Sequence, residues 1–128
     1  MDETGYYVDS DKTIGQLTVD LEKATSAAGF RVLAVHDVQA TLAEKGFKIE
    51  PLRIFEVCNA AFAHDALSRD IKAAMFMPCK IILSERGGRS VITLVRPSMI
   101  AEILPDSGLD GLASEVEKKL KTIVDEIK

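Results

Sequence analysis

Two cysteines, Cys58 and Cys79, carry the most versatile chemistry in this sequence. A thiolate is a nucleophile, exchanges with disulfides and binds metals. Cys58 precedes a segment that can form a helix, and the backbone N–H groups at a helix N-terminus would stabilise a thiolate and lower its pKa. Cys58 is therefore a candidate reactive thiol, with Cys79 as its partner. The alternative for both is inert burial, because free cysteine often behaves as a small hydrophobe.

Two histidines, His36 and His64, widen the possible chemistry. With the cysteines they could hold zinc or supply an axial ligand to haem, but no pair has CxxC or HxxxH spacing. We therefore predict no metal and no cofactor. A nucleophile pair of Cys58 and His64 would need a third residue to orient the imidazole, and Asp65 points about 100° round the helix from His64. The sequence contains no complete catalytic constellation, and whether it is an enzyme stays open.

A methionine-rich stretch, Met75–Cys79, follows the segment after Cys58. Such residues often fill a core, but methionine surfaces also bind apolar ligands adaptably. We expect a cleft near Cys58 that takes a small molecule or a protein partner. The predicted ligand-binding residues are Cys58, Asn59, Met75, Met77, Pro78 and Cys79.

Length, composition and net charge limit the number of domains and the kinds of partner that this chain can have. The chain has 128 residues, 47% of them hydrophobic, and a net charge of −4, which suits one globular domain over residues 1–128. Without clustered positive charge, no nucleic-acid partner is expected. The longest apolar runs are too short to span a bilayer, so no membrane association is expected. The polar, acidic segment Met1–Asp11 does not resemble a secretory signal, so we expect a cytoplasmic protein.

The first half of the chain alternates strands and helices. Tyr6–Val8 can form a short strand, and Thr13 with Gln16 forms a capping box that opens a helix. Its apolar stripe contains Ile14, Leu17, Leu21, Ala24 and Ala28, and Gly29 ends it in a left-handed conformation. Arg31–Val38 is β-branched and predicts a strand, and Gln39–Gly46 predicts a short helix or turn.

The second half contains the candidate site. Leu52–Cys58 predicts a strand, and Asn59 caps a helix expected over Ala60–Ala73. Pro78 breaks the chain before two strands, Cys79–Glu85 and Ser90–Arg96, which a Gly87-Gly88 turn joins as a hairpin. Cys79 shares a strand face with Ile81 and Leu83, which favours a core-facing thiol. A C-terminal helix carries one apolar stripe of Leu109, Leu112, Val116, Leu120, Ile123 and Ile127.

These elements predict an α+β fold with two layers, a mainly antiparallel sheet and helices on one face. The other face of the sheet would expose apolar side chains of the Ser90–Arg96 strand unless something covers it. A homodimer would cover it, and so would a loop or the segment Ser98–Leu104. If the strands that bear Cys58 and Cys79 are antiparallel neighbours, both thiols lie at the same end of the sheet. If they are parallel, the thiols lie roughly 17–20 Å apart.

Two stretches carry a family resemblance: Glu56–Leu67, with the sequence EVCNAAFAHDAL, and the segment from Phe76 to Leu104. Over most of the chain, from about Tyr7 to the C-terminal helix, the sequence resembles the domain-of-unknown-function 302 family. One branch of that family has a Cys-Asn-Pro turn and a Pro-Cys pair, which correspond to Cys58-Asn59 and Pro78-Cys79. Ala60 replaces the proline of the turn, so a rigid turn is not implied there.

The resemblance implies a curved antiparallel sheet with helices on one side, similar in topology to the TATA-binding-protein repeat. It also implies a dimer and antiparallel neighbouring strands for the two cysteines, but no reaction. Two functions follow from the residues and the resemblance together. The first is a non-catalytic homodimeric module that binds a ligand or partner. The second is a redox or sulfur-handling protein that uses Cys58 as its reactive thiol and Cys79 as its partner.

Overall fold

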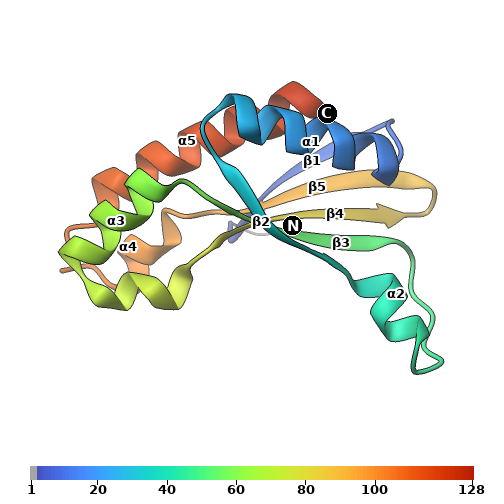
Figure 1. Ribbon diagram of the computed structural model, residues 1–128, viewed down its shortest axis with the longest axis horizontal. Coiled ribbons are helices and arrows are strands. Elements are labelled where there is room, and N and C mark those ends of the chain that lie inside the picture. The colour runs from blue at the N-terminus through green and yellow to red at the C-terminus, as the bar shows by residue number, and fades with distance from the viewer. Residues whose placement is uncertain (1–2) are drawn as a thin grey trace.

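A five-stranded sheet forms one layer of the protein (Figure 1). The computed structural model describes residues 3–128, so Met1 and Asp2 of the acidic N-terminal segment lie outside the described part. The strands are β1 (Gly5–Ser10), β2 (Arg31–Asp37), β3 (Leu52–Cys58), β4 (Cys79–Arg86) and β5 (Arg89–Val95). Their order is β1-β5-β4-β3-β2, and every neighbouring pair is antiparallel. The predicted α+β fold is confirmed.

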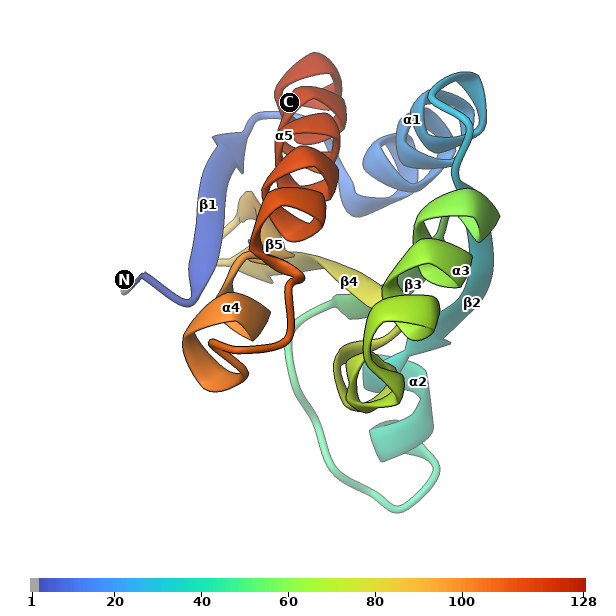
Figure 2. The same ribbon diagram turned by 90° about the vertical axis from the view of Figure 1, so that its left-hand side faces the viewer.

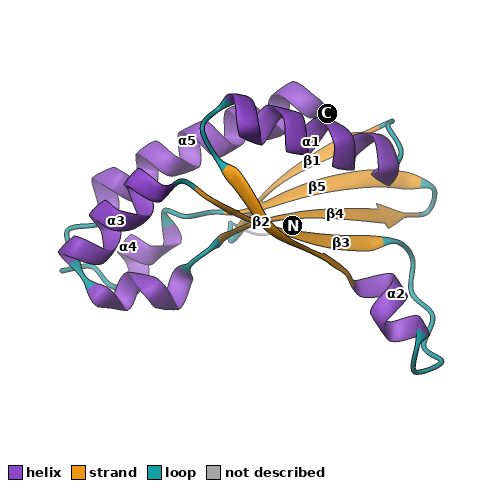
Figure 3. Ribbon diagram, in the orientation of Figure 1, coloured by secondary structure: helices purple, strands orange, loops and turns teal. Residues whose placement is uncertain are grey.

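The helices form the second layer. They are α1 (Ile14–Ala27), α2 (Val38–Ala43), α3 (Ala60–Arg69), the 3-10 helix η1 (Ile71–Phe76), α4 (Met99–Ile103) and α5 (Asp110–Ile127). Figure 2 shows α1, α3 and α5 on the same side of the sheet, and Figure 3 shows α2 projecting beyond the end of the strands. The helices thus cover one face, as the amphipathic patterns predicted.

The sequence motifs that predicted the two ends of α1 are present in the structure. The Thr13 side chain accepts a hydrogen bond from the Gln16 N–H, and the Gln16 side chain accepts one from the Thr13 N–H. Gly29 follows α1 with a φ of 82°, a conformation that strains any residue with a Cβ atom. Both motifs depend on residues within a few positions of each other, which is why sequence alone locates them.

The predicted helix over Ala60–Ala73 was wrong in its length. Asp70 leaves the helical region, with a φ of −157° and a ψ of 117°, and its side chain accepts a hydrogen bond from the Lys72 N–H. This cap ends α3 at Arg69 and starts the separate helix η1, which turns Ala73 into an apolar cluster. Smaller differences are that β1 is longer than Tyr6–Val8 and that α2 begins at Val38, capped by Asp37.

The main core lies between the sheet and helices α1 and α5. Alternate strand residues point into it, among them Phe55 and Val57 of β3 and Ile81 and Leu83 of β4, all fully buried. A second cluster lies beyond the strand ends and joins η1, α4 and α5 through Ala73, Ile100, Leu109, Leu112 and Ala113. The end of the molecule that contains the two cysteines is therefore built from helices packed on one another.

The other face of the sheet carries a row of partly exposed side chains. The register aligns Tyr7, Thr93, Ile82 and Ile54 across β1, β5, β4 and β3. The segment Ser98–Leu104 does not cover this row, because it forms α4 and packs with α5 on the helical side. Within residues 3–128, no helix is both long and apolar enough to cross a bilayer.

Candidate functional site

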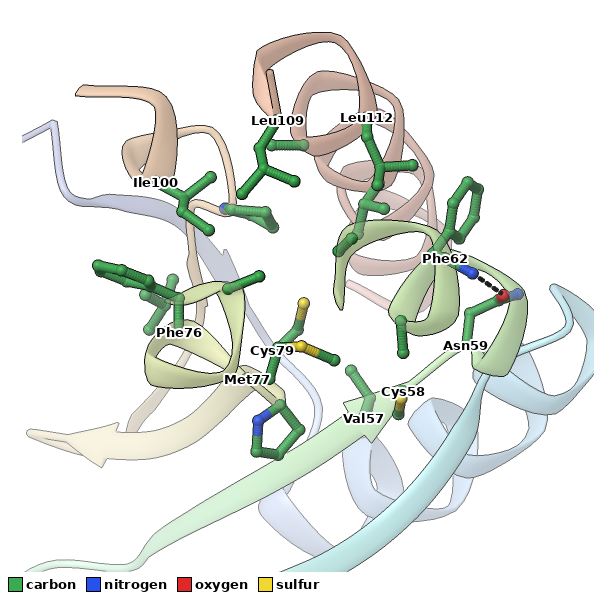
Figure 4. A pocket seen from close by; sticks show the side chains of 18 of the residues that line it. Val57, Cys58, Asn59, Phe62, Phe76, Met77, Cys79, Ile100, Leu109 and Leu112 are labelled. Atoms are coloured by element: carbon green, nitrogen blue, oxygen red, sulfur yellow. Dashed lines mark hydrogen bonds between the residues drawn. The ribbon is translucent and has the colours of Figure 1, made fainter. Parts of the chain in front are cut away.

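A cavity opens where β3 ends and β4 begins, beneath the helices of the second cluster (Figure 4). Its volume is about 290 Å³, close to the lower end of the range for pockets that hold small molecules. All six predicted ligand-binding residues lie in its wall: Cys58, Asn59, Met75, Met77, Pro78 and Cys79. The structure therefore brings together residues from two separate stretches of sequence around one space.

Asn59 fixes the junction between β3 and α3. Its Oδ1 accepts a hydrogen bond of 3.1 Å from the Phe62 N–H, which caps α3 as predicted. Its Nδ2 donates a hydrogen bond of 3.0 Å to the Gly29 carbonyl, which ties the junction to the end of α1. Phe62, held in this way, packs against Phe30 with ring centroids 6.3 Å apart. The Asn59 side chain thus builds one wall of the cavity.

The two thiols lie at the same end of neighbouring antiparallel strands but on different faces. Cys79 pairs with Val57 in the β3–β4 ladder, and side chains directly opposite each other share a face. Cys58 is the next residue after Val57, so its side chain projects to the other side of β3 (Figure 4). Both cysteines are half-buried free thiols. The expected proximity along the strands is present, but the thiols do not face each other.

Cys79 packs against the main core and lines the cavity. Burial first, and the nearby Cys58 second, raise the pKa of its thiol to about 11, while Lys80 opposes the shift. At neutral pH, Cys79 is therefore a protonated and weakly nucleophilic side chain. The prediction that it faces the core is confirmed.

The helix η1 places methionines at the mouth and in the wall. Met75 is 76% exposed, so core filling does not account for it, whereas Met77 is half-buried and packs against the second cluster. Sequence reasoning missed the opposite wall, which contains Met99 and Ile100 of α4 and Leu109 and Leu112 of the α5 region. The leucines belong to the predicted apolar stripe of the C-terminal helix, but no sequence pattern singled out Met99.

A buried carboxylate holds the wall formed by α4 and α5. Glu117 Oε1 accepts hydrogen bonds from the Ser98 hydroxyl at 2.6 Å and from the Ser98 N–H at 3.1 Å, and Oε2 pairs with Arg96 at 3.4 Å and Lys121 at 3.3 Å. Burial acts most strongly on this carboxyl and would raise its pKa. The hydrogen bonds from Ser98, with Lys121 and Arg96, outweigh burial and hold the pKa of Glu117 below its usual value.

Both histidines lie away from the cavity wall. His36 Nε2 is 2.7 Å from Glu56 Oε1 on the opposite face of the sheet, and His64 is exposed on α3. Asp65 pairs with Arg69 at 2.8 Å, so its nearest ionic partner is not the imidazole of His64. No group of three His, Cys, Asp or Glu side chains suited to a metal occurs in the described range 3–128. A nucleophile pair of Cys58 and His64 has no geometric support.

The polar groups at the cavity are largely committed to the fold. Arg96 donates to the Glu3 carbonyl at 2.8 Å and to the Ser98 hydroxyl at 3.1 Å as well as pairing with Glu117. Asn59 uses both ends of its amide. Throughout residues 3–128, no buried side-chain nitrogen or oxygen lacks a hydrogen-bond partner. The cavity is therefore an apolar, sulfur-lined space whose wall could bind a molecule but offers no assembled acid, base or activated nucleophile.

Comparison with known proteins gives a family match and a structural match, each over nearly the whole chain. Residues 6–127 match the family model described as domain of unknown function DUF302. The crystal structure of an uncharacterised conserved DUF302 protein from Bacillus stearothermophilus is similar, with a TM-score of 0.95 and 29% sequence identity. The similarity covers 99% of this chain and 100% of that chain. No curated protein matches the sequence significantly.

Proposed function

This chain belongs to the DUF302 family, and from that premise we propose that it is a non-catalytic, homodimeric binding module whose cavity takes a small apolar ligand. The observation that carries this proposal is the convergence of all six predicted binding residues on one apolar cavity of about 290 Å³. Met75, exposed at the mouth, and half-buried Met77 give the wall the flexible side chains that adapt to a ligand's shape.

Binding an apolar ligand requires fewer functional groups at the site than catalysis does. Two polar side chains of the cavity wall, Asn59 and Arg96, already make hydrogen bonds within the protein. Recognition would then depend on shape and on burial of apolar surface, which stabilises a complex by about 25 cal/mol per Å² before the costs of association. The redox alternative has less support, because Cys58 and Cys79 project from opposite faces of the sheet.

The experiment uses N-phenyl-1-naphthylamine, a neutral apolar dye whose fluorescence increases in an apolar site. We expect saturable binding to the wild-type protein. Ala63→Leu places a larger side chain in the cavity wall and should weaken binding about tenfold, since overpacking costs about 1–3 kcal/mol. Ala61→Leu is the matched control, because Ala61 is exposed on α3 outside the wall. Equal affinity for both variants, or no saturable binding, would overturn the cavity as the binding site.

The homodimer is proposed through the open face of the sheet. The row of Tyr7, Thr93, Ile82 and Ile54 gives it a continuous, largely apolar centre. Glu56 and Lys80 lie opposite each other on this face, so it carries both signs of charge. A two-fold axis brings the same patch of each protomer together, which allows one protomer's carboxylate to pair with its partner's ammonium group.

Light scattering after size-exclusion chromatography tests the dimer. The wild type should have the mass of two chains, and Ile82→Glu should give monomers because it buries an unpaired charge in the interface. Val19→Glu is the control, since Val19 is 50% exposed on α1 and lies in the helical layer. A monomeric wild type would remove the dimer from the proposal and leave ligand binding standing.

We further propose a reducing compartment such as the cytoplasm, which suits two free thiols.

A further inference from the structure

Sulfur is concentrated at the cavity. The chain has four methionines and two cysteines, and Met75, Met77, Met99, Cys58 and Cys79 all lie in the cavity wall. Each sulfur-containing residue within the described range 3–128 lies in this wall, but the Cys58 side chain projects to the other face of β3. The possible sulfur donors are therefore Met75, Met77, Met99 and Cys79, which come from η1, β4, α4 and their connections. A core that needed only apolar volume would not require its sulfur atoms to gather in one place.

From this convergence we propose that the cavity binds a monovalent copper ion, Cu(I), through the Cys79 sulfur and the Met77 thioether, with further thioethers from Met75 and Met99. This inference rests on the proposed binding function of the same cavity and names its ligand class. Thiolate and thioether groups are soft donors, and a site that combines them suits Cu(I), which is a soft ion.

Met77 and Cys79 form the centre of the site. Met77 follows the end of η1 with an extended backbone, and Cys79 begins β4. Figure 4 shows both side chains within the cavity. Met75 at the exposed mouth and Met99 on α4 lie in the surrounding wall. Each methionine has three rotatable side-chain bonds, so these thioethers can move towards a bound ion.

The charge of the site favours a monovalent ion. One thiolate and one Cu(I) ion make a neutral pair, which an apolar cavity can hold without leaving a buried net charge. The wall contains the cationic residues Lys80 and Arg96, of which Arg96 pairs with Glu117, and no Asp, Glu or His side chain. A divalent ion bound by one thiolate would therefore add an uncompensated positive charge there. Zinc sites are built from cysteine, histidine and carboxylate ligands, whereas three of the four possible sulfur donors here are thioethers.

The binding step is a ligand exchange without electron transfer. The Cys79 S–H bond breaks, a sulfur–copper bond forms, and the proton passes to the solvent, so one proton is released for each Cu(I) bound. Copper enters and stays in the monovalent state, which means that the donor must be a Cu(I) complex. The thioethers donate electron pairs and lose no proton.

The test is an anaerobic competition between the reduced protein and the coloured Cu(I) complex of bicinchoninate. We expect the wild type to withdraw one Cu(I) per chain and to release one proton. Cys79→Ser should weaken binding roughly 100-fold or more, since even loss of an outer-shell partner costs 10–100-fold. Met77→Leu keeps the apolar volume and should weaken binding about tenfold. Cys58→Ser should weaken binding far less than Cys79→Ser does, because the Cys58 thiol projects from the opposite face. Ala61→Leu, on the exposed side of α3 outside the wall, is the control and should bind as the wild type does.

Dye binding separates the two proposals. If N-phenyl-1-naphthylamine binds but the protein fails to compete for Cu(I), the copper inference is overturned and the ligand-binding proposal stands. If Cu(I) binds and the dye does not, the copper site stands and the apolar-ligand proposal falls. Equal Cu(I) affinity in Cys79→Ser and the wild type would overturn the assigned ligand. An equal loss in Cys58→Ser and Cys79→Ser would overturn the assignment to the cavity face. A circular dichroism spectrum and a urea unfolding midpoint like those of the wild type show that Cys79→Ser and Met77→Leu keep their fold.

Discussion

Cys58 and Cys79 lie at the same end of two neighbouring antiparallel strands, yet they belong to opposite faces of the sheet. The direct partner of Cys79 in the ladder is Val57, and a step of one residue along a strand reverses the direction of the side chain. Both cysteines lie in the cavity wall, but the Cys79 side chain shares the face of Val57 beneath the helices, while the Cys58 side chain projects from the far side of β3 (Figure 4). The two thiols therefore do not face each other across the paired strands.

The first prediction concerns oxidation. The folded protein, treated with oxidised glutathione, should form no bond between Cys58 and Cys79, because their side chains point apart and a disulfide requires Cβ atoms about 3.5–4.5 Å from each other. Peptide mapping under non-reducing conditions measures the linkage. Protein unfolded in urea is the control and should form it. An internal disulfide in the folded protein at neutral pH would revive the redox function.

The second prediction concerns thiol reactivity in the metal-free protein. Burial raises the pKa of Cys79 to about 11 from 9.0, so at neutral pH its thiolate population falls about 100-fold. Iodoacetamide should therefore modify Cys79 about 100-fold more slowly in the folded protein than in urea, and the rate should rise until the pH approaches 11. Mass spectrometry of the separated peptides gives the rate at each site. Rapid modification of Cys79 in the folded protein at pH 7 would contradict this structure of the site.

The third prediction concerns the cap of α3. Asn59→Ala removes the hydrogen bond from the Phe62 N–H and the one to the Gly29 carbonyl, and should lower the free energy of unfolding by about 1–2 kcal/mol. Asn59→Asp keeps an acceptor for the Phe62 N–H but loses the donor, so its loss should be smaller. Urea unfolding monitored by circular dichroism measures both. An unchanged midpoint for Asn59→Ala would show that the cap does not hold the wall.

The fourth prediction concerns acid stability. Hydrogen bonds and cations hold the pKa of Glu117 below its unfolded value, so its contribution to stability is complete above about pH 4.3. That contribution disappears as the pH falls through the lowered folded-state pKa. Glu117→Gln should cost roughly 1–3 kcal/mol at pH 7 and less in acid, where the wild type also carries a neutral side chain.

Urea unfolding at several pH values between neutral and strongly acidic conditions provides the measurement for Glu117. Glu115→Gln is the control, because Glu115 is exposed on the same helix. Its effect should be within the small range of surface substitutions. A loss for Glu117→Gln that stays constant with pH would mean that the carboxylate charge does not stabilise the α4–α5 wall.

Sequence alone located the features that depend on near neighbours. The capping box of Thr13 and Gln16, the Asn59 cap and the strand Leu52–Cys58 all occur where predicted. It also identified the family, since residues 6–127 match its model. The six predicted binding residues came from two stretches that flank one helix, and the structure places all of them in one cavity wall. Their role in binding stays a prediction.

Tertiary structure decided what depends on distant neighbours. The strand pairing put Cys79 opposite Val57 and thereby sent Cys58 to the other face, which no periodicity within one strand can reveal. The break at Asp70 places Ala73 in a cluster with residues of α4 and α5. The cavity wall that contains Met99 is formed by the packing of these helices, so the sequence alone did not reveal it. Caps and strands follow from hydrogen bonds within a few residues of chain. A cavity, by contrast, is the space left when side chains far apart in sequence pack together, so its shape and lining exist only in the folded protein.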